Sequence, residues 1–210
     1  MAEEVIAIEG GHRLNGTVTI SGAKNATVAL IPSIVLSDEP VEIYNVPEIS
    51  DVDALTVLLE ELNCVVERNI SVGEIGVDPR NMKNIPLVSS AVDKLRASYY
   101  FMGALLGKYK EVTIRMPGGC YLGPRPIDLH LKGFEALGVE IKIDHGYVEG
   151  EAKELIGGKV VFDFPSVGAT ENVIMAAVKA KGKTVIENAA REPEIDDLCN
   201  FLNKMGAKIE

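Results

Sequence analysis

The feature that most constrains the fold of this chain is an internal repeat, in which a unit of about seventy residues occurs three times. Three short apolar segments, residues 41–45, 112–116 and 184–188, align without gaps and are read as equivalent strands. At the same distance before each strand an apolar helix begins, and a second helix follows each strand. Because chance produces one such match more readily than three in register, we interpret the chain as a triplicated scaffold.

Each unit is predicted to contain strands and helices in the order βαβαββ, which places the chain in the α/β (α+β) class. The first helices are predicted at residues 26–36, 97–106 and 169–180, and the second helices begin at Asp53, Asp128 and Asp196. In the first of these second helices, Leu55, Leu58, Leu59 and Leu62 recur at helical spacing. The second helices end before Asn63, Gly138 and Gly206, residue types that suit a left-handed cap.

A strand follows each second helix, at residues 64–67, 139–143 and 207–209, and a further strand closes a hairpin at 74–77 and 147–149. The units cover about residues 17–80, 81–150 and 158–210, and the first unit is predicted to open with a strand at 17–20. Glu210 corresponds to Glu67, partway through the closing hairpin, so the third unit is expected to be truncated.

The loop between strand and second helix is longer in one unit than in the others. It has seven residues at 46–52 and at 189–195, but eleven at 117–127. The long loop contains Cys120 among three glycines and three prolines. One interpretation is a surface turn with an incidental cysteine. The comparison between units favours another, in which a mobile loop with a reactive thiol is added to a rigid scaffold.

The starts of the three first helices are candidates for an anion-binding site. Lys24 and Asn25 lie beside the first of them, where free amides and the helix dipole favour anions, although the spacing is not that of a Walker loop. Arg96 and Gly168 occupy the place of Asn25 in the other units. Packed around a pseudo-threefold axis, these groups would face one region and suit a diphosphate. Taken singly, they also read as a solvated lysine, an asparagine cap and an ion-paired arginine.

Composition argues against several classes of function. The net charge of −10 disfavours a nucleic-acid or anionic-membrane surface, and no apolar run is long enough to span a bilayer. Three unevenly spaced cysteines are typical of reduced thiols, not of a disulfide framework or a zinc site, and Cys64 and Cys199 read as packing residues. No signal peptide opens the chain, so we expect a cytoplasmic protein. The histidines read as structural or exposed, and His130, near the long loop, is the candidate among them for a role.

The two ends of the chain point to a longer protein. Residues 5–11 are predicted to form a strand with no counterpart in the second or third unit. We therefore assign residues 1–16 to a second domain and residues 17–210 to the three-unit domain. The truncated third unit supports the same expectation, that this chain is a fragment whose partner is a missing second domain.

Five motifs, in order along almost the whole chain, resemble the bacterial UDP-N-acetylglucosamine 1-carboxyvinyltransferases, a family of enolpyruvyl transferases. They are SGAKNA at 21–26, LRAS at 95–98, PGGC at 117–120 with Gly123, RPIDLH at 125–130 and PSVGAT at 165–170. The related shikimate-pathway enzyme shares the architecture, but its own signatures are not found in this sequence. The resemblance implies two inside-out α/β barrel domains, each of three such units with pseudo-threefold symmetry, and substrates bound in the cleft between them.

The resemblance also implies a reaction. The family transfers the enolpyruvyl group of phosphoenolpyruvate to the 3-hydroxyl of UDP-N-acetylglucosamine and releases phosphate, which is the first committed step of peptidoglycan synthesis. It does so without a metal or an organic cofactor. A general acid for the methylene carbon and a base for the hydroxyl are what this addition requires.

Motif positions assign roles to individual residues. Cys120 would be the proton donor and the thiol that phosphoenolpyruvate or the epoxide fosfomycin modifies. Lys24 and Asn25 would contact phosphoenolpyruvate and the sugar nucleotide, Arg96 the UDP-sugar, and Arg125 would neutralise phosphate charge. The uridine side would be lined by Pro126, Ile127, Asp128, Leu129, Ser166, Val167 and Gly168.

The chain also departs from the family. The family's base, an aspartate, and another arginine for phosphoenolpyruvate lie in the later half of the protein, outside these residues. The isolated fragment is therefore expected to be inactive. The alternative function is a non-catalytic nucleotide-sugar-binding or regulatory domain.

Overall fold

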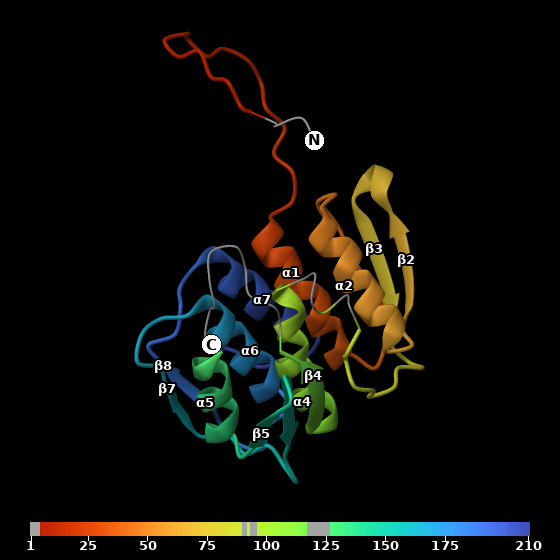
Figure 1. The fold of residues 1–210 in the computed structure, drawn as a ribbon, viewed down its shortest axis with the longest axis vertical. Coiled ribbons are helices and arrows are strands. Elements are labelled where there is room, and N and C mark those ends of the chain that lie inside the picture. The colour runs from red at the N-terminus through yellow and green to blue at the C-terminus, as the bar shows by residue number, and fades with distance from the viewer. Residues whose placement is uncertain (1–4, 90–91, 93–95, 117–126) are drawn as a thin grey trace.

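The computed structural model describes residues 5–89, 92, 96–116 and 127–210, and the description of Arg96 is limited to its backbone. Residues 5–20 extend away from the rest of the molecule, and residues 5–23 contain no strand (Figure 1). The strands predicted at 5–11 and 17–20 are therefore not formed, because nothing in the described part of the chain pairs with them. Their apolar side chains are exposed, including Ile6 at 91% and Ile20 at 83%.

The first unit is a helix pair with a three-stranded antiparallel sheet. Its elements are α1 (Lys24–Ser33), η1 (Ile34–Leu36), β1 (Val41–Ile43), α2 (Ser50–Glu61), β2 (Val65–Asn69), η2 (Ile70–Val72) and β3 (Glu74–Asp78). The strand order is β1-β3-β2, so the last strand of the unit lies in the centre. Leu55, Leu58, Leu59 and Leu62 are all fully buried, as their spacing predicts.

The second unit repeats this arrangement. Its elements are η3 (Arg96–Tyr99), α4 (Tyr100–Tyr109), β4 (Glu111–Arg115), α5 (Asp128–Ala136), β5 (Glu140–Asp144) and β6 (Tyr147–Glu151). The strand order β4-β6-β5 again places the last strand in the centre. Leu87 adds a parallel bridge to Ile114 of β4.

The third unit contains β7 (Lys159–Val161), α6 (Val167–Ala177), β8 (Val185–Glu187) and α7 (Pro193–Lys204), with β7 and β8 parallel. The strand predicted at 207–209 is not formed. In the first two sheets the corresponding strand pairs with the central strand that follows it, β3 or β6. Among the described residues no strand takes this central place beside 207–209.

Helices α1, α4 and α6 lie in the middle of the molecule, and the sheets formed by the described residues lie at its periphery (Figure 1). Every residue of α4 from Tyr100 to Gly107 is buried, and so is every residue of α6 from Ala169 to Ala176. Gly103 makes the crossing of these helices possible, since a Cβ added there would lie 2.2 Å from the carbonyl oxygen of Asn172. The α/β class follows directly from these elements, whereas the barrel and its pseudo-threefold axis stay predictions.

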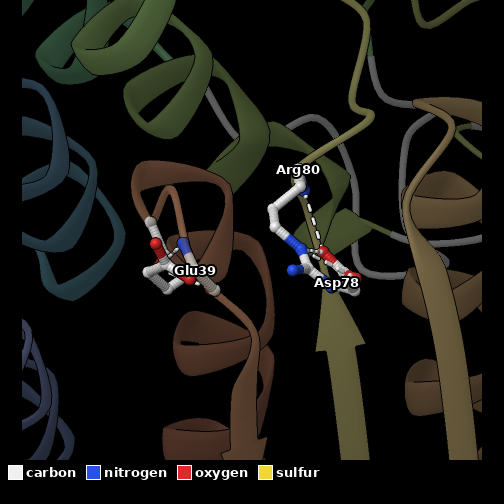
Figure 2. A network of polar contacts seen from close by, with 4 residues as sticks. Glu39, Asp78 and Arg80 are labelled. Carbon is white, nitrogen blue, oxygen red and sulfur yellow. Dashed lines mark hydrogen bonds and ion pairs between the residues drawn. The ribbon is translucent and has the colours of Figure 1, made fainter.

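An ion pair between Asp78 and Arg80 lies at the end of β3 in the first unit. Arg80 contacts the Asp78 carboxylate through both Nε, 2.9 Å from Oδ1, and Nη2, 2.6 Å from Oδ2 (Figure 2). These hydrogen bonds lower the pKa of Asp78 to about 2. Arg80 thus holds the turn after β3 through its contacts with Asp78.

Candidate functional site

A cavity of about 630 Å³ lies where several helices begin. Its described lining residues are Asn25, Val28, Tyr99, Tyr100, Asp128, Leu129, His130, Asp163, Phe164, Ser166, Val167, Gly168, Glu171 and Glu194. Most of them lie in the first two turns of α1, α5, α6 and α7. Tyr99 is the last residue of η3, Tyr100 begins α4, and Asp163, Phe164 and Ser166 precede α6. Helix starts carry unpaired backbone N–H groups and the positive end of the dipole, so their convergence favours a ligand that carries negative charge or many acceptor oxygens.

The start of α1 supplies two of the predicted site residues, each held by a carboxylate of another helix. Lys24 Nζ lies 2.7 Å from Oδ1 of Asp51 in α2, and its side chain is half-exposed. Asn25 donates from Nδ2 to Oε1 of Glu194 in α7, at 3.0 Å. The helix is preceded by Ala23 and has no side-chain cap, so the reading of Asn25 as a cap is wrong. Both side chains are oriented by contacts between helices and not by their own helix.

The start of α5 supplies three more. Ile127 precedes the helix and is buried, whereas Asp128 is exposed in the first turn and Leu129 is half-buried. Asp128 and Leu129 line the cavity, and Ile127 packs into the hydrophobic core behind it. His130, the next residue, is 5% exposed and also reaches the cavity wall.

The start of α6 forms an adjoining part of the cavity wall, next to His130. Ser166 caps this helix through Oγ, which accepts the N–H of Ala169 at 3.4 Å. Val167 and Gly168 follow in the first turn and line the cavity together with Ser166. Gly168 leaves no room for a larger residue, because a Cβ added there would lie 2.7 Å from the hydroxyl of Tyr99. The predicted uridine-side residues on α5 and α6 are thus brought to one cavity.

The other predicted site residues cannot be placed. Cys120, Arg125 and Pro126 lie outside the described residues. Arg96 begins η3, three residues before Tyr99 of the cavity wall, but its side chain is not described. The described residues therefore include those predicted to bind the sugar nucleotide. The roles of the Cys120 thiol and of the Arg96 and Arg125 side chains stay predictions.

The described charged residues that line the cavity are all acidic: Asp128, Asp163, Glu171 and Glu194. Glu171 is fully buried, and neither of its carboxyl oxygens has a hydrogen-bond partner of normal geometry. Burial raises the pKa of Glu171 to about 7, the nearby Tyr100 hydroxyl lowers it in part, and Glu194 and Glu192 raise it further. Burial likewise raises the pKa of the Tyr100 hydroxyl. Glu171 is consequently a neutral acid below about pH 7.

Sequence reasoning missed the buried polar residues of α6. Thr170, Glu171 and Asn172 are consecutive, and each is at most 1% exposed. Successive helical residues point about 100° apart, so three buried polar neighbours require a helix that is surrounded on all sides. Three polar residues in a row inside an otherwise apolar helix is the signal that could have revealed them.

The two described cysteines are free and packed into the structure, as predicted. Cys64 is buried, and burial raises the pKa of its thiol to about 11. Burial and Asp196 also raise the pKa of Cys199. A raised pKa lowers the fraction of reactive thiolate, so neither Cys64 nor Cys199 is expected to be a reactive thiol. Within the described ranges no group of three potential ligands could hold a metal ion, and no helix is long and apolar enough to cross a bilayer.

Comparison with known proteins gives a consistent family signal. A profile of the EPSP synthase (3-phosphoshikimate 1-carboxyvinyltransferase) family matches residues 8–210. The UDP-N-acetylglucosamine 1-carboxyvinyltransferase 2 of Oceanobacillus iheyensis is 55% identical over 205 residues, which are 98% of this chain and 47% of that protein. The Bacillus subtilis protein of the same name is 53% identical over 207 residues, 99% of this chain and 48% of its own.

Solved structures support the fold. The enolpyruvyl transferase NikO from Streptomyces tendae superimposes with a TM-score of 0.83 at 22% identity, over 96% of this chain and 47% of that one. EPSP synthase from Acinetobacter baumannii superimposes with a TM-score of 0.72 at 17% identity, over 93% of this chain and 44% of that one. The chain spans about half the length of the curated relatives it matches.

Proposed function

The chain belongs to the EPSP synthase family of enolpyruvyl transferases, and on that premise we propose that it forms the nucleotide-sugar-binding half of a UDP-N-acetylglucosamine 1-carboxyvinyltransferase. The proposed reaction moves the enolpyruvyl group of phosphoenolpyruvate to the sugar 3-hydroxyl and releases phosphate. It would supply peptidoglycan synthesis in the cytoplasm. The relatives carry the name of this activity, and the proposal extends it to this chain.

The observation that carries the proposal is the meeting of α1, α5 and α6 at one cavity. Asn25, the Asp128–Leu129 pair and the segment 166–168 come from three separate motifs and line the same space. Converging helix starts suit a diphosphate, and the acidic side chains suit the hydroxyl and N–H donors of a sugar and a base. A UDP-sugar presents both kinds of group.

The proposed chemistry is an addition followed by an elimination. The sugar 3-hydroxyl oxygen bonds to C2 of phosphoenolpyruvate, its proton passes to a base, and the Cys120 thiol gives a proton to C3. Loss of phosphate from C2 and of a proton from the new methyl group then restores the double bond. Lys24, Arg96 and Arg125 would balance the charge of the phosphate groups, and the base would come from a second domain.

We propose that this second domain also covers the arm at residues 5–20. Its exposed apolar side chains, among them Ile6, Leu14 and Ile20, form no contacts that bury them in this chain. Without that domain the 210 residues would bind the nucleotide sugar but not turn it over.

The test is phosphate release by the full-length protein with phosphoenolpyruvate and alternative acceptors. UDP-N-acetylglucosamine should support release, and 3-phosphoshikimate, the acceptor in the name of the matching family profile, should not. Phosphate release with 3-phosphoshikimate but not with UDP-N-acetylglucosamine would refute the proposed reaction. So would the absence of release with either acceptor. The 210 residues alone should bind UDP-N-acetylglucosamine in calorimetry without releasing phosphate. The alternative function, a non-catalytic binding domain, predicts binding without phosphate release for the full-length protein as well.

A second test addresses Cys120. Fosfomycin should alkylate it faster than Cys64 or Cys199, because both of these thiols have raised pKa values and are wholly or partly buried. Peptide mass mapping after a short exposure in the presence of UDP-N-acetylglucosamine would measure the three rates. Equal labelling of the three cysteines would remove the support for Cys120 as the reactive thiol.

A further inference from the structure

We propose that Asn172 and His130 act as a positioning pair, which fixes the α5 wall of the cavity against the α6 wall. Asn172 lies in the centre of α6 and is fully buried, and His130 lies in the first turn of α5. Asn172 Nδ2 is 3.0 Å from His130 Nδ1. The identity of the ligand in this proposal rests on the proposed function, whereas the contact itself does not.

The backbone of α4 determines how the Asn172 amide is oriented. The N–H of Gly103 points at the side chain and lies 2.8 Å from Oδ1, so the atom that it meets must be the carbonyl oxygen. The amide nitrogen is then the atom that faces α5. One asparagine side chain therefore joins three helices, accepting from α4 and donating to α5.

This orientation fixes the proton of His130. An amide N–H that donates to Nδ1 requires this ring nitrogen to be unprotonated, so the neutral ring carries its proton on Nε2. A proton on Nδ1 would place two donors face to face in the core. Turning the amide would relieve that clash, but it would set the Asn172 nitrogen against the Gly103 N–H. The arrangement thus admits one tautomer of His130.

The His130 ring is wedged between residues of the cavity wall. Its centroid lies 4.8 Å from that of Tyr99, with the rings at 74°. On the α6 side, a Cβ added to Gly168 would lie 3.1 Å from Cε1 of His130. The ring therefore cannot shift without moving Tyr99 or the first turn of α6. Since Asp128 and Leu129 precede His130 in the same turn, the pair sets their place relative to Gly168.

The test compares two substitutions of His130 in the full-length protein. His130→Phe keeps a ring but removes the acceptor, and leaves the Asn172 N–H buried without a partner. His130→Asn places a carbonyl oxygen near the position of Nδ1. We expect the Kd of UDP-N-acetylglucosamine to rise about tenfold in His130→Phe, and most of that loss to be recovered in His130→Asn.

A spectroscopic measurement tests the pair without any ligand. The imidazole ¹⁵N shifts of His130, assigned by their loss in His130→Phe, should report a neutral ring protonated on Nε2 at pH 7. Asn172→Asp should reverse this tautomer, because a carboxylate accepts the Gly103 N–H and also requires a donor on Nδ1. A ring protonated on Nδ1 in the wild type would overturn the proposal, whatever the protein binds.

Ser33→Ala is the control for a loss of stability alone. Ser33 is fully buried at the far end of α1, donates to the carbonyl oxygen of Leu30, and does not line the cavity. It should lower the unfolding midpoint and leave the Kd unchanged. If His130→Phe behaves like Ser33→Ala, or if His130→Asn recovers no affinity, the pair has no positioning role. Absence of UDP-N-acetylglucosamine binding by the wild type would count against the proposed function, and the ¹⁵N result would still decide the pair.

Discussion

The starts of α1 and α6 occupy equivalent places in the repeat, yet they organise their polar groups in opposite ways. At α1 the polar side chains, Lys24 and Asn25, are on the surface and are held by acidic residues of neighbouring helices. At α6 the surface presents Gly168 and the Ser166 cap, and the polar side chains are inside. The start of α1 therefore presents polar side chains to a ligand, whereas the start of α6 presents mainly backbone groups.

The aligned positions within the two helices locate this difference. Thr27 of α1 corresponds to Thr170 of α6, and both hydroxyl-bearing residues are buried. The next two positions are Val28 and Ala29 in α1 but Glu171 and Asn172 in α6. In the predicted alignment of the units a buried hydroxyl is thus common to both helices, whereas the acid and the amide occur in α6 and not in α1.

The difference has an energetic consequence. The polar side chains at the start of α1, Lys24 and Asn25, lie near water, where an ion pair contributes little to stability and is free to exchange partners with a ligand. Polar groups of α6 lie in the core, where each lost partner leaves a buried group unsatisfied. Substitutions near α6 should therefore change the free energy of unfolding strongly, and substitutions near the start of α1 should change ligand binding more than stability.

The largest effect is expected from Gly103→Ala at the crossing of α4 and α6. The new Cβ would lie 2.2 Å from the carbonyl oxygen and 2.9 Å from the carbonyl carbon of Asn172. Both are backbone atoms, so no side-chain rotation relieves the clash. We expect a loss of about 3–5 kcal/mol in the free energy of unfolding, measured by urea denaturation.

Gly158→Ala is the matched control. The nearest atom to its added Cβ is the carbonyl oxygen of Ala136 at 3.7 Å, an ordinary van der Waals contact. Its stability should stay within about 1 kcal/mol of the wild type. Equal losses in the two variants would show that the close crossing of α4 and α6 is not what makes Gly103 sensitive.

The second prediction concerns the pH dependence that Glu171 imposes. Its pKa is about 7 in the folded protein, against a usual value of 4.5, so the folded protein holds this proton more tightly than the unfolded chain. The stabilisation is complete below pH 4.5 and is lost as the pH rises through 7. Between pH 5 and pH 8, wild-type stability should fall by about 2–3 kcal/mol more than that of Glu171→Gln.

Glu67→Gln serves as the control for this pH series. Glu67 is an exposed residue of β2, so its substitution should leave the pH dependence of the wild type unchanged. Thermal or urea unfolding across the pH range measures all three proteins. Parallel curves for wild type and Glu171→Gln would mean that Glu171 ionises in the folded protein as readily as in water.

The third prediction sets the two equivalent threonines against each other. Thr170 Oγ1 accepts the N–H of Ala190, which has 4% exposure, so Thr170→Val leaves that donor buried and unpaired. Thr27 Oγ1 donates to the carbonyl oxygen of Ala23, which the N–H of Thr27 also contacts. We expect Thr170→Val to cost about 1–3 kcal/mol and Thr27→Val less than about 1 kcal/mol in urea unfolding. A larger loss for Thr27→Val would reverse the comparison.

Much of the fold could be predicted from the sequence, because the repeat allows each helix or strand to be inferred from aligned segments in three units. The caps expected at Asn63, Gly138 and Gly206 all have positive φ, at 66°, 91° and 105°. Helix starts agree less well, since α7 begins at Pro193 and not at Asp196, with proline in the first turn where its missing N–H is harmless. The strands expected at 5–11, 17–20 and 207–209 failed for another reason: a strand needs a partner, and periodicity does not reveal whether one is present.

The site was predictable to a lesser degree. Motifs on three helices led to Asn25, Asp128 and Gly168, which do line one cavity. Glu171 and Asn172 were missed, because a polar residue in an apolar helix is normally assigned to the exposed face. The packing of α6 among other helices leaves residues 169–176 without an exposed face.

The smallest effect on stability is expected at the start of α1. Lys24 and Asp51 form a 2.7 Å ion pair with side-chain exposures of 56% and 21%. Asp51→Asn should change the free energy of unfolding by less than about 1 kcal/mol, as should Glu187→Gln, which removes the more exposed ion pair with Lys159. The two should differ in binding of inorganic phosphate. Freed from its carboxylate, Lys24 should bind phosphate a few-fold more tightly in Asp51→Asn, while Glu187→Gln leaves the affinity unchanged. Weaker phosphate binding in Asp51→Asn would mean that Asp51 orients the lysine for its ligand and does not compete with it, and α1 would then be as constrained as α6.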